Sequence, residues 1–102
     1  MKLSIAEMKK RNESIGECWF SPATMEVWGT RIVAQPNIVN IFITLEPTFD
    51  GSRHAYTLRW FDESTSRVET LGELNEYPSM DAARAARRKF TKAKQEAEMV
   101  RP

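Results

Sequence analysis

The sequence predicts a single α+β domain in which an N-terminal helix and a longer C-terminal helix pack on an antiparallel sheet of three or four strands. Helical apolar spacing with capping residues occurs near both ends of the chain. Three segments with the composition of strands lie between them. The length of 102 residues fits one domain and leaves no room for a second core.

The first helix is expected at residues 4–15 because its start carries a capping box. Ser4 precedes Glu7 by three residues, so the hydroxyl can accept from the backbone while the carboxylate reaches back. Leu3 and Met8 occupy the positions of a hydrophobic staple, and Gly16 suits a helix stop. These signals fix both ends of the helix.

The next segment, 17–37, is predicted to be irregular with one short turn. Ser21 and Pro22 are residue types that start helices, which favours a helical turn over 22–27. The same stretch also fits a strand bent at Gly29, and both alternatives remain open.

The aromatic residues of this segment, Trp19, Phe20 and Trp28, are expected mainly in the core. The alternative is an exposed contact surface, because Trp is enriched among the residues that anchor interfaces. Trp19 and Trp28 are therefore candidate contact residues.

Strands are predicted at 38–45, 54–61 and 67–74. The first is a β-branched apolar run between Pro36 and Pro47, which is typical of a strand buried on both faces. The second alternates and follows the turn dipeptide Asp50–Gly51. An antiparallel meander is the simplest arrangement of the three.

The last element is a helix predicted at 79–98. Ser79 follows Pro78 as its N-cap, and Asp81 favours the positive end of the helix dipole. Small apolar residues and one Phe recur at spacings of three and four: Ala83, Ala86, Phe90, Ala93 and Ala97. The stripe is narrow, so we expect close packing through Phe90 and a projecting far end.

The sequence contains few residues in patterns that could support catalysis. His54 is the only imidazole and lacks triad spacing, so a position in a loop or at a strand edge is expected. The single Cys18 excludes an internal disulfide and is expected to be a buried apolar residue. Neither a glycine-rich phosphate loop nor metal-ligand spacing occurs. We therefore expect no enzyme, no metal site and no cofactor.

The expected cellular location follows from two features that the sequence lacks. No apolar run approaches the roughly 20 residues that cross a bilayer, and the first residues lack the apolar core of a signal peptide. We expect a cytoplasmic protein of the host cell, without a membrane partner.

The net charge of +1 conceals two oppositely charged parts. From residue 79 onward the chain has seven cationic and three acidic residues, a net charge of +4, which leaves −3 for the rest of the chain. Arg84, Arg88 and Lys92 follow at four-residue spacing and form one ridge. Arg87 and Lys94 flank this ridge. Such a ridge can bind phosphates, and the alternative is an ordinary solvated face.

One resemblance concerns nucleic acids. The order helix, three-stranded meander, helix is similar to that of the double-stranded-RNA-binding domain, and residues 51–58 loosely resemble its Gly-Pro-x-His loop. This resemblance implies RNA binding through that loop, with Arg53 and His54, and through the start of the second helix. Ser52 replaces the Pro, and Asp81 lies where that family has lysines. Nucleic-acid binding is accordingly the alternative hypothesis.

A second resemblance covers nearly the whole chain. The stretches 19–25, 42–44, 56–62, 72–74 and 77–83 resemble small uncharacterised proteins carried by phages, prophages and plasmids. This resemblance implies an accessory gene of a mobile element. The leading hypothesis is a non-enzymatic module that binds and occludes a host or phage macromolecule, first of all a protein, such as a component of a defence system. A homodimer is a third hypothesis.

Overall fold

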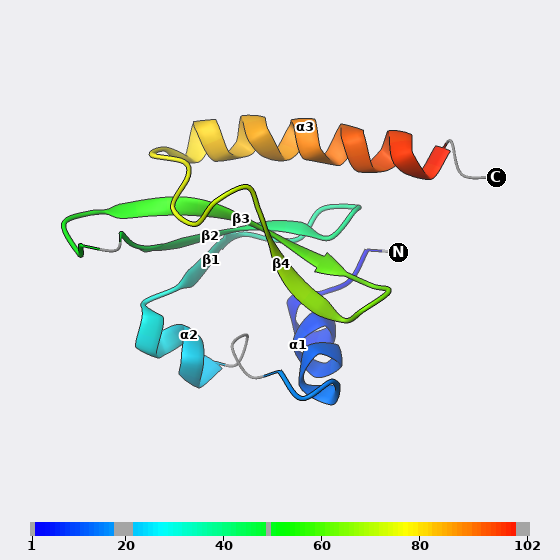
Figure 1. Cartoon of the computed structure of the whole chain (residues 1–102), viewed down its shortest axis with the longest axis horizontal. Coiled ribbons are helices and arrows are strands. Elements are labelled where there is room, and N and C mark those ends of the chain that lie inside the picture. Colours follow the sequence, from blue (N-terminus) through cyan, green and yellow to red (C-terminus); the bar gives the residue numbers. More distant parts are fainter. Residues whose placement is uncertain (1, 18–21, 49, 100–102) are drawn as a thin grey trace.

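The computed structural model describes residues 2–17, 22–48 and 50–99. The described elements are α1 (Ile5–Ser14), α2 (Pro22–Trp28), β1 (Arg31–Ala34), β2 (Ile41–Pro47), β3 (His54–Asp62), β4 (Arg67–Leu71) and α3 (Met80–Met99). The strands form one antiparallel sheet in the order β1-β2-β3-β4. Helix α3 covers one face of the sheet, and α1 and α2 lie on the other (Figure 1). The predicted α+β architecture is confirmed.

The two long helices begin where the capping residues predicted. The Ser4 hydroxyl accepts from the backbone nitrogen of Glu7 at 3.2 Å. The Ser79 hydroxyl likewise accepts from the backbone nitrogen of Ala82 at 3.1 Å. Leu3 and Met8, the predicted staple pair, are both buried in one hydrophobic cluster. Local cap chemistry therefore sets both helix starts.

The segment expected to be irregular contains one helix and one strand. The helical alternative is correct for residues 22–27, since α2 spans them. The fourth strand that the predicted sheet left open is β1, but no range was predicted for it, because its four residues are too few to show a clear alternation. Gly29 joins the two elements with a φ of +67°, and a Cβ at this position would lie 3.2 Å from the Pro47 ring. Cys18, Trp19, Phe20 and Ser21 lie outside the described residues.

Strand β2 starts three residues later than predicted because a turn precedes it. The Asn37 side chain accepts from the backbone nitrogens of Val39 and Ile41 at 3.1 and 3.0 Å. Asn40 then adopts a left-handed φ of 64°. These bonds hold residues 37–40 in a turn and leave Ile38 exposed.

Strand β4 ends at Leu71, before the predicted residue 74. Gly72 has a φ of +79°, which turns the chain away from β3. The chain returns at Tyr77, which pairs with Tyr56 in a single antiparallel bridge. Residues 72–76 therefore form a loop beside the N-terminal part of β3.

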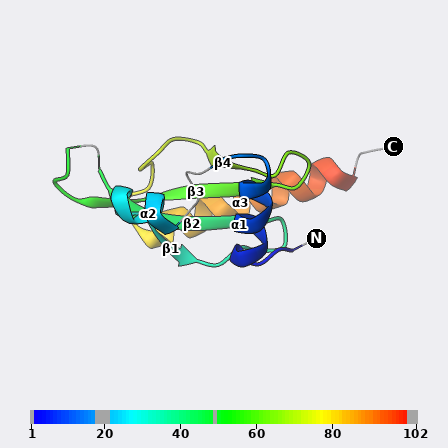
Figure 2. The same cartoon turned by 90° about the horizontal axis from the view of Figure 1, so that it is seen from below.

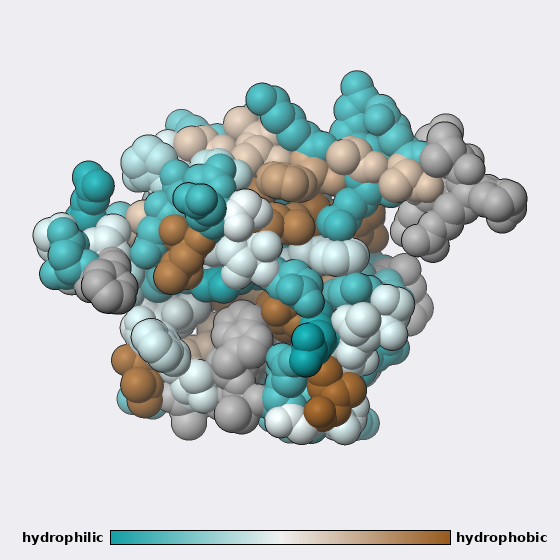
Figure 3. Space-filling view, viewed as in Figure 1, coloured by the Kyte–Doolittle hydropathy of each residue, from teal (hydrophilic) through white to brown (hydrophobic). Residues whose placement is uncertain are grey.

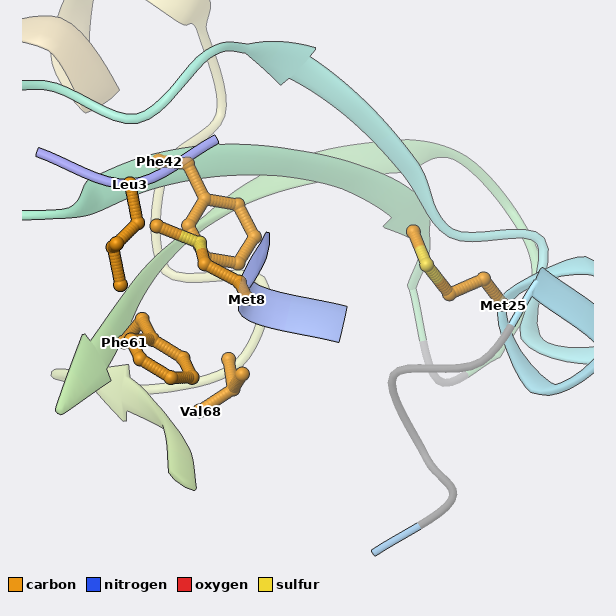
Figure 4. Close-up of a cluster of buried hydrophobic side chains, with 6 residues drawn as sticks. All are labelled: Leu3, Met8, Met25, Phe42, Phe61 and Val68. Carbon is orange, nitrogen blue, oxygen red and sulfur yellow. The ribbon is translucent and has the colours of Figure 1, made fainter. Parts of the chain in front are cut away.

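The core has one cluster on each face of the sheet. The cluster facing α1 and α2 contains Leu3, Met8, Met25, Phe42, Phe61 and Val68 (Figure 4). Ile43, Leu58 and Ala83 form the centre of the cluster under α3, where Phe90 packs against them as predicted. Ala93 and Ala97 are exposed. Toward its C-terminus α3 runs past the end of the sheet (Figure 2).

Candidate functional site

A cavity of about 520 Å³ opens on the α2 side of the sheet, between α2, the end of β2 and the loop 72–76. Helices α1 and α2 lie at different ends of this face (Figure 2). The cavity therefore occupies the end that α1 does not cover. Its size suits one small ligand or a few side chains of a partner.

Three exposed apolar side chains form the rim of this cavity. Val27 is 84% exposed, Trp28 70% and Leu74 57%. Met25 anchors α2 in the core, and Val27 lies two residues later, about 200° around the helix axis. A single turn of helix thus buries one apolar side and exposes another. Hydrophobic atoms accordingly appear at the α2 end of the surface (lower left in Figure 3).

The floor of the cavity is polar and includes a buried ion pair. A guanidinium nitrogen of Arg59 lies 2.7 Å from a carboxylate oxygen of Glu46. Threonines complete the network: Thr44 and Thr57 donate to Glu46 at 3.0 and 2.9 Å, and Arg59 donates to Thr70 at 2.8 Å. Each charge is therefore met by an opposite charge and by hydroxyl groups.

The strand register explains why polar residues meet here. Phe42 and Thr44 of β2 lie opposite Arg59 and Thr57 of β3. Alternate residues share a face, so Glu46 extends the same row. The apolar end of this row packs under α1, and the polar end forms the floor of the cavity.

Asn75 adds a hydrogen-bond donor beside the network. Its backbone nitrogen donates to the Thr57 hydroxyl at 2.9 Å, which attaches the loop 72–76 to the sheet. Its side-chain nitrogen is buried and has no hydrogen-bond partner within the described part of the chain.

A second cavity of about 490 Å³ lies near the C-terminal half of α3. Within it the Lys94 ammonium lies 3.2 Å from the ring centroid of Trp60, and the Trp60 indole donates to the carbonyl of Val39 at 3.1 Å. Burial lowers the pKa of Lys94, and the Asp62 carboxylate opposes this shift. Trp60 and Lys94 thus stabilise the packing of α3.

The predicted basic ridge is exposed, with Lys92 4.0 Å from the Glu96 carboxylate, whereas the flanking Arg87 is engaged with the sheet. Arg84, Arg88 and Lys92 are exposed. Arg87 is partly buried and donates to the carbonyls of Gln35 and Ile41 at 3.0 and 3.4 Å. Burial, and to a smaller extent the charge of Arg84, lowers the pKa of Arg87. Hydrophilic side chains project from the outer side of α3 (top of Figure 3).

The other predicted binding residues are not gathered at one place. Arg53 and His54 are exposed in the β2–β3 hairpin, which extends past the N-terminal end of α3 (Figure 1). Lys92 lies in the C-terminal half of α3, whereas the hairpin lies beyond the N-terminal end of that helix. Trp28 is exposed at the cavity, so its expected place in the core is wrong, and its role as a contact residue stays a prediction. Trp19 lies outside the described residues.

Sequence reasoning did not identify Glu46, Arg59, Leu74 or Asn75 as site residues. One signal was available, since Thr44, Thr57 and Arg59 are polar residues between apolar neighbours in the predicted strands. In the described ranges, no three His, Cys, Asp or Glu side chains gather as metal ligands. None of the described helices combines the length and apolarity that a membrane crossing needs.

Comparison with known proteins identifies a family. Residues 4–88 match a family of unknown function, DUF7447. This match covers all the described strands and the first part of α3. No curated protein and no solved structure matches the chain.

Proposed function

The chain belongs to DUF7447, a family of unknown function, and we propose from its surface that it is a non-enzymatic module that binds a partner protein at the Trp28 cavity. The observation that carries this proposal is the exposure of Val27 and Trp28 at the rim of a cavity. Interfaces take most of their binding energy from a few aromatic or apolar anchors around a pocket. The rim and the cavity have this composition.

The cost of leaving these side chains exposed supports the same proposal. A Trp and a Val in water on adjacent positions of one short helix contribute little to the core. Larger exposed apolar patches on soluble proteins mark interaction sites. The resemblance to phage and plasmid proteins adds that the partner belongs to a host or phage, where binding would occlude it, as in the inhibition of a defence system.

Affinity capture from host cells tests this proposal. Wild-type protein should retain a specific partner, and Trp28→Ser should lose it without a change in thermal stability, because Trp28 is solvent-exposed. Ile38→Ser is the matched control, since Ile38 is 59% exposed and lines the other cavity. If both variants retain the same proteins as the wild type, the Trp28 cavity is not the binding site.

A second candidate function is nucleic-acid binding by α3. The exposure of Arg84, Arg88 and Lys92 on one ridge favours it, since each phosphate contact releases counterions. Titration with duplex RNA, duplex DNA and single strands at two salt concentrations tests it. Salt-dependent binding that Arg84→Ala/Arg88→Ala/Lys92→Ala abolishes would support this function. Lack of binding at micromolar protein would rule it out.

A further inference from the structure

We infer that the segment that enters the Trp28 cavity combines an apolar side chain with flanking lysine or arginine residues. This inference rests on the proposed function and adds the chemistry of the partner. It follows from the charges that surround the rim of the cavity.

Exposed carboxylates adjoin each side of the rim. Glu26 directly precedes Val27 on α2, and it is exposed. On the facing side, Glu73 precedes Leu74 and Glu76 follows Asn75, and both carboxylates are exposed. The Glu76 carboxylate also accepts from the backbone nitrogen of Glu73 at 2.8 Å, which orders the loop. Exposed negative charge therefore adjoins the apolar rim in sequence, both on α2 and in the loop 72–76.

The cations of this end of the molecule do not offset these charges. Arg31 is paired with Leu45 in the β1–β2 register, and Leu45 alternates with residues that face α1 and α2, so Arg31 lies on the α3 face. Arg53 lies beside Asp50, whose pKa its charge helps to lower. Arg59 is neutralised by Glu46 in the floor of the cavity.

A cationic segment with one apolar side chain is complementary to this surface in both apolar character and charge. Its apolar side chain would bury Val27, Trp28 and Leu74, and its lysine or arginine would meet the carboxylates at the sides. An ammonium or guanidinium over the exposed indole of Trp28 adds a cation–π interaction. The network in the floor carries no net charge, so the inserted side chain needs no charge of its own.

The same charges disfavour two other occupants. Phosphates of a nucleic acid would meet Glu26, Glu73 and Glu76 and be repelled. A second copy that paired through the same surface would place these carboxylates against one another. A basic segment of a different protein has the complementary charge.

Selection from a displayed library of random twelve-residue peptides tests the inference on the full-length protein. Peptides are selected on the wild type and depleted on Trp28→Ser, and synthetic copies are then titrated by fluorescence anisotropy. The charge variant is Glu26→Lys/Glu73→Lys. The control is Glu13→Lys/Glu69→Lys, which changes the net charge equally at exposed positions of α1 and β4.

We expect the Trp28-dependent peptides to carry an apolar residue between cations. The charge variant should weaken them about tenfold at low salt, and the control less than about twofold. The inference would be overturned by Trp28-dependent peptides that lack cations, or by peptides that bind the charge variant and the control with equal affinity. Either result would leave the proposed function intact. Failure to obtain any Trp28-dependent peptide would contradict the proposed function itself. Self-association of the wild type that Trp28→Ser abolishes would replace the partner with a second copy.

Discussion

The guanidinium of Arg59 lies 2.7 Å from the carboxylate of Glu46 in the interior of the sheet, with only 11% and 6% of the two side chains exposed. Such a pair has lost most of its hydration and depends on its partners for compensation. Thr44, Thr57 and Thr70 supply the remaining hydrogen bonds. The pair thus gives the cavity a floor that is polar, neutral and fixed in position.

Removal of one member of this pair should be strongly destabilising. Arg59→Met leaves the Glu46 carboxylate buried without its cation, and we expect the free energy of unfolding to fall by about 3–5 kcal/mol. Chemical denaturation measures this change. The double variant Glu46→Leu/Arg59→Met restores much of the loss, because no charge is left unpaired. A double variant as unstable as the sum of both single variants would show that the pair is not coupled.

The sequence predicted the parts of the fold that local chemistry determines. Ser4 and Ser79 begin their helices, and the apolar run before Pro47 is buried on both faces. Strand β1 was not predictable in the same way, because it is stabilised by pairing with β2 rather than by its own pattern. The start of β2 depends on side-chain bonds of Asn37, which no periodicity reveals.

The candidate site was less predictable than the fold, because it depends on contacts between distant residues. Arg59 and Glu46 are 13 positions apart and meet only through the strand register. Leu74 reaches the cavity because Gly72 ends β4 early. Trp28 is a residue type that suits core and interface equally, and only the orientation of α2 shows that it lies outside the core.

Asn40 should be one of the most sensitive positions in the loops of this protein. It is buried, its side chain accepts from the backbone nitrogen of Leu3 at 2.7 Å and donates to Glu63 at 3.0 Å, and its φ is 64°. We expect Asn40→Ala to lower the free energy of unfolding by about 2–3 kcal/mol. Asn40→Gly should cost less, because glycine accepts the left-handed backbone. Equal losses for both variants would show that the backbone conformation contributes nothing.

Arg87, which is hydrogen-bonded to backbone carbonyls, and the exposed Arg88 should respond differently to substitution. Arg87→Ala removes the bonds to the carbonyls of Gln35 and Ile41, and we expect a loss of about 1–2 kcal/mol in thermal or chemical unfolding. Arg88→Ala, one residue along on the exposed side, should stay within about 0.5 kcal/mol of the wild type. The reverse order of these effects would contradict the orientation of α3.

The carboxyl group of Asp50 should titrate at unusually low pH. The backbone nitrogen and hydroxyl of Ser52, and then the hydroxyl of Thr48, lower its pKa from 3.8 to about 2. Any contribution of these bonds to the hairpin is therefore complete above pH 3.8 and lost as the pH falls through about 2. NMR titration of the carboxyl carbon measures the pKa directly. Ser52→Ala should raise it toward the ordinary value, and an unchanged pKa would contradict the assigned bonds.

The most direct test of a partner site at Trp28 is the affinity of a captured partner for two variants measured side by side. One variant is Trp28→Ser, and the other is Arg84→Ala/Arg88→Ala/Lys92→Ala on the opposite face of the molecule. We expect the dissociation constant to rise by at least about 30-fold for Trp28→Ser, the loss of an anchor worth about 2 kcal/mol, and to change little for the triple variant. An unchanged affinity for Trp28→Ser with loss of binding in the triple variant would contradict the account and place the partner on α3.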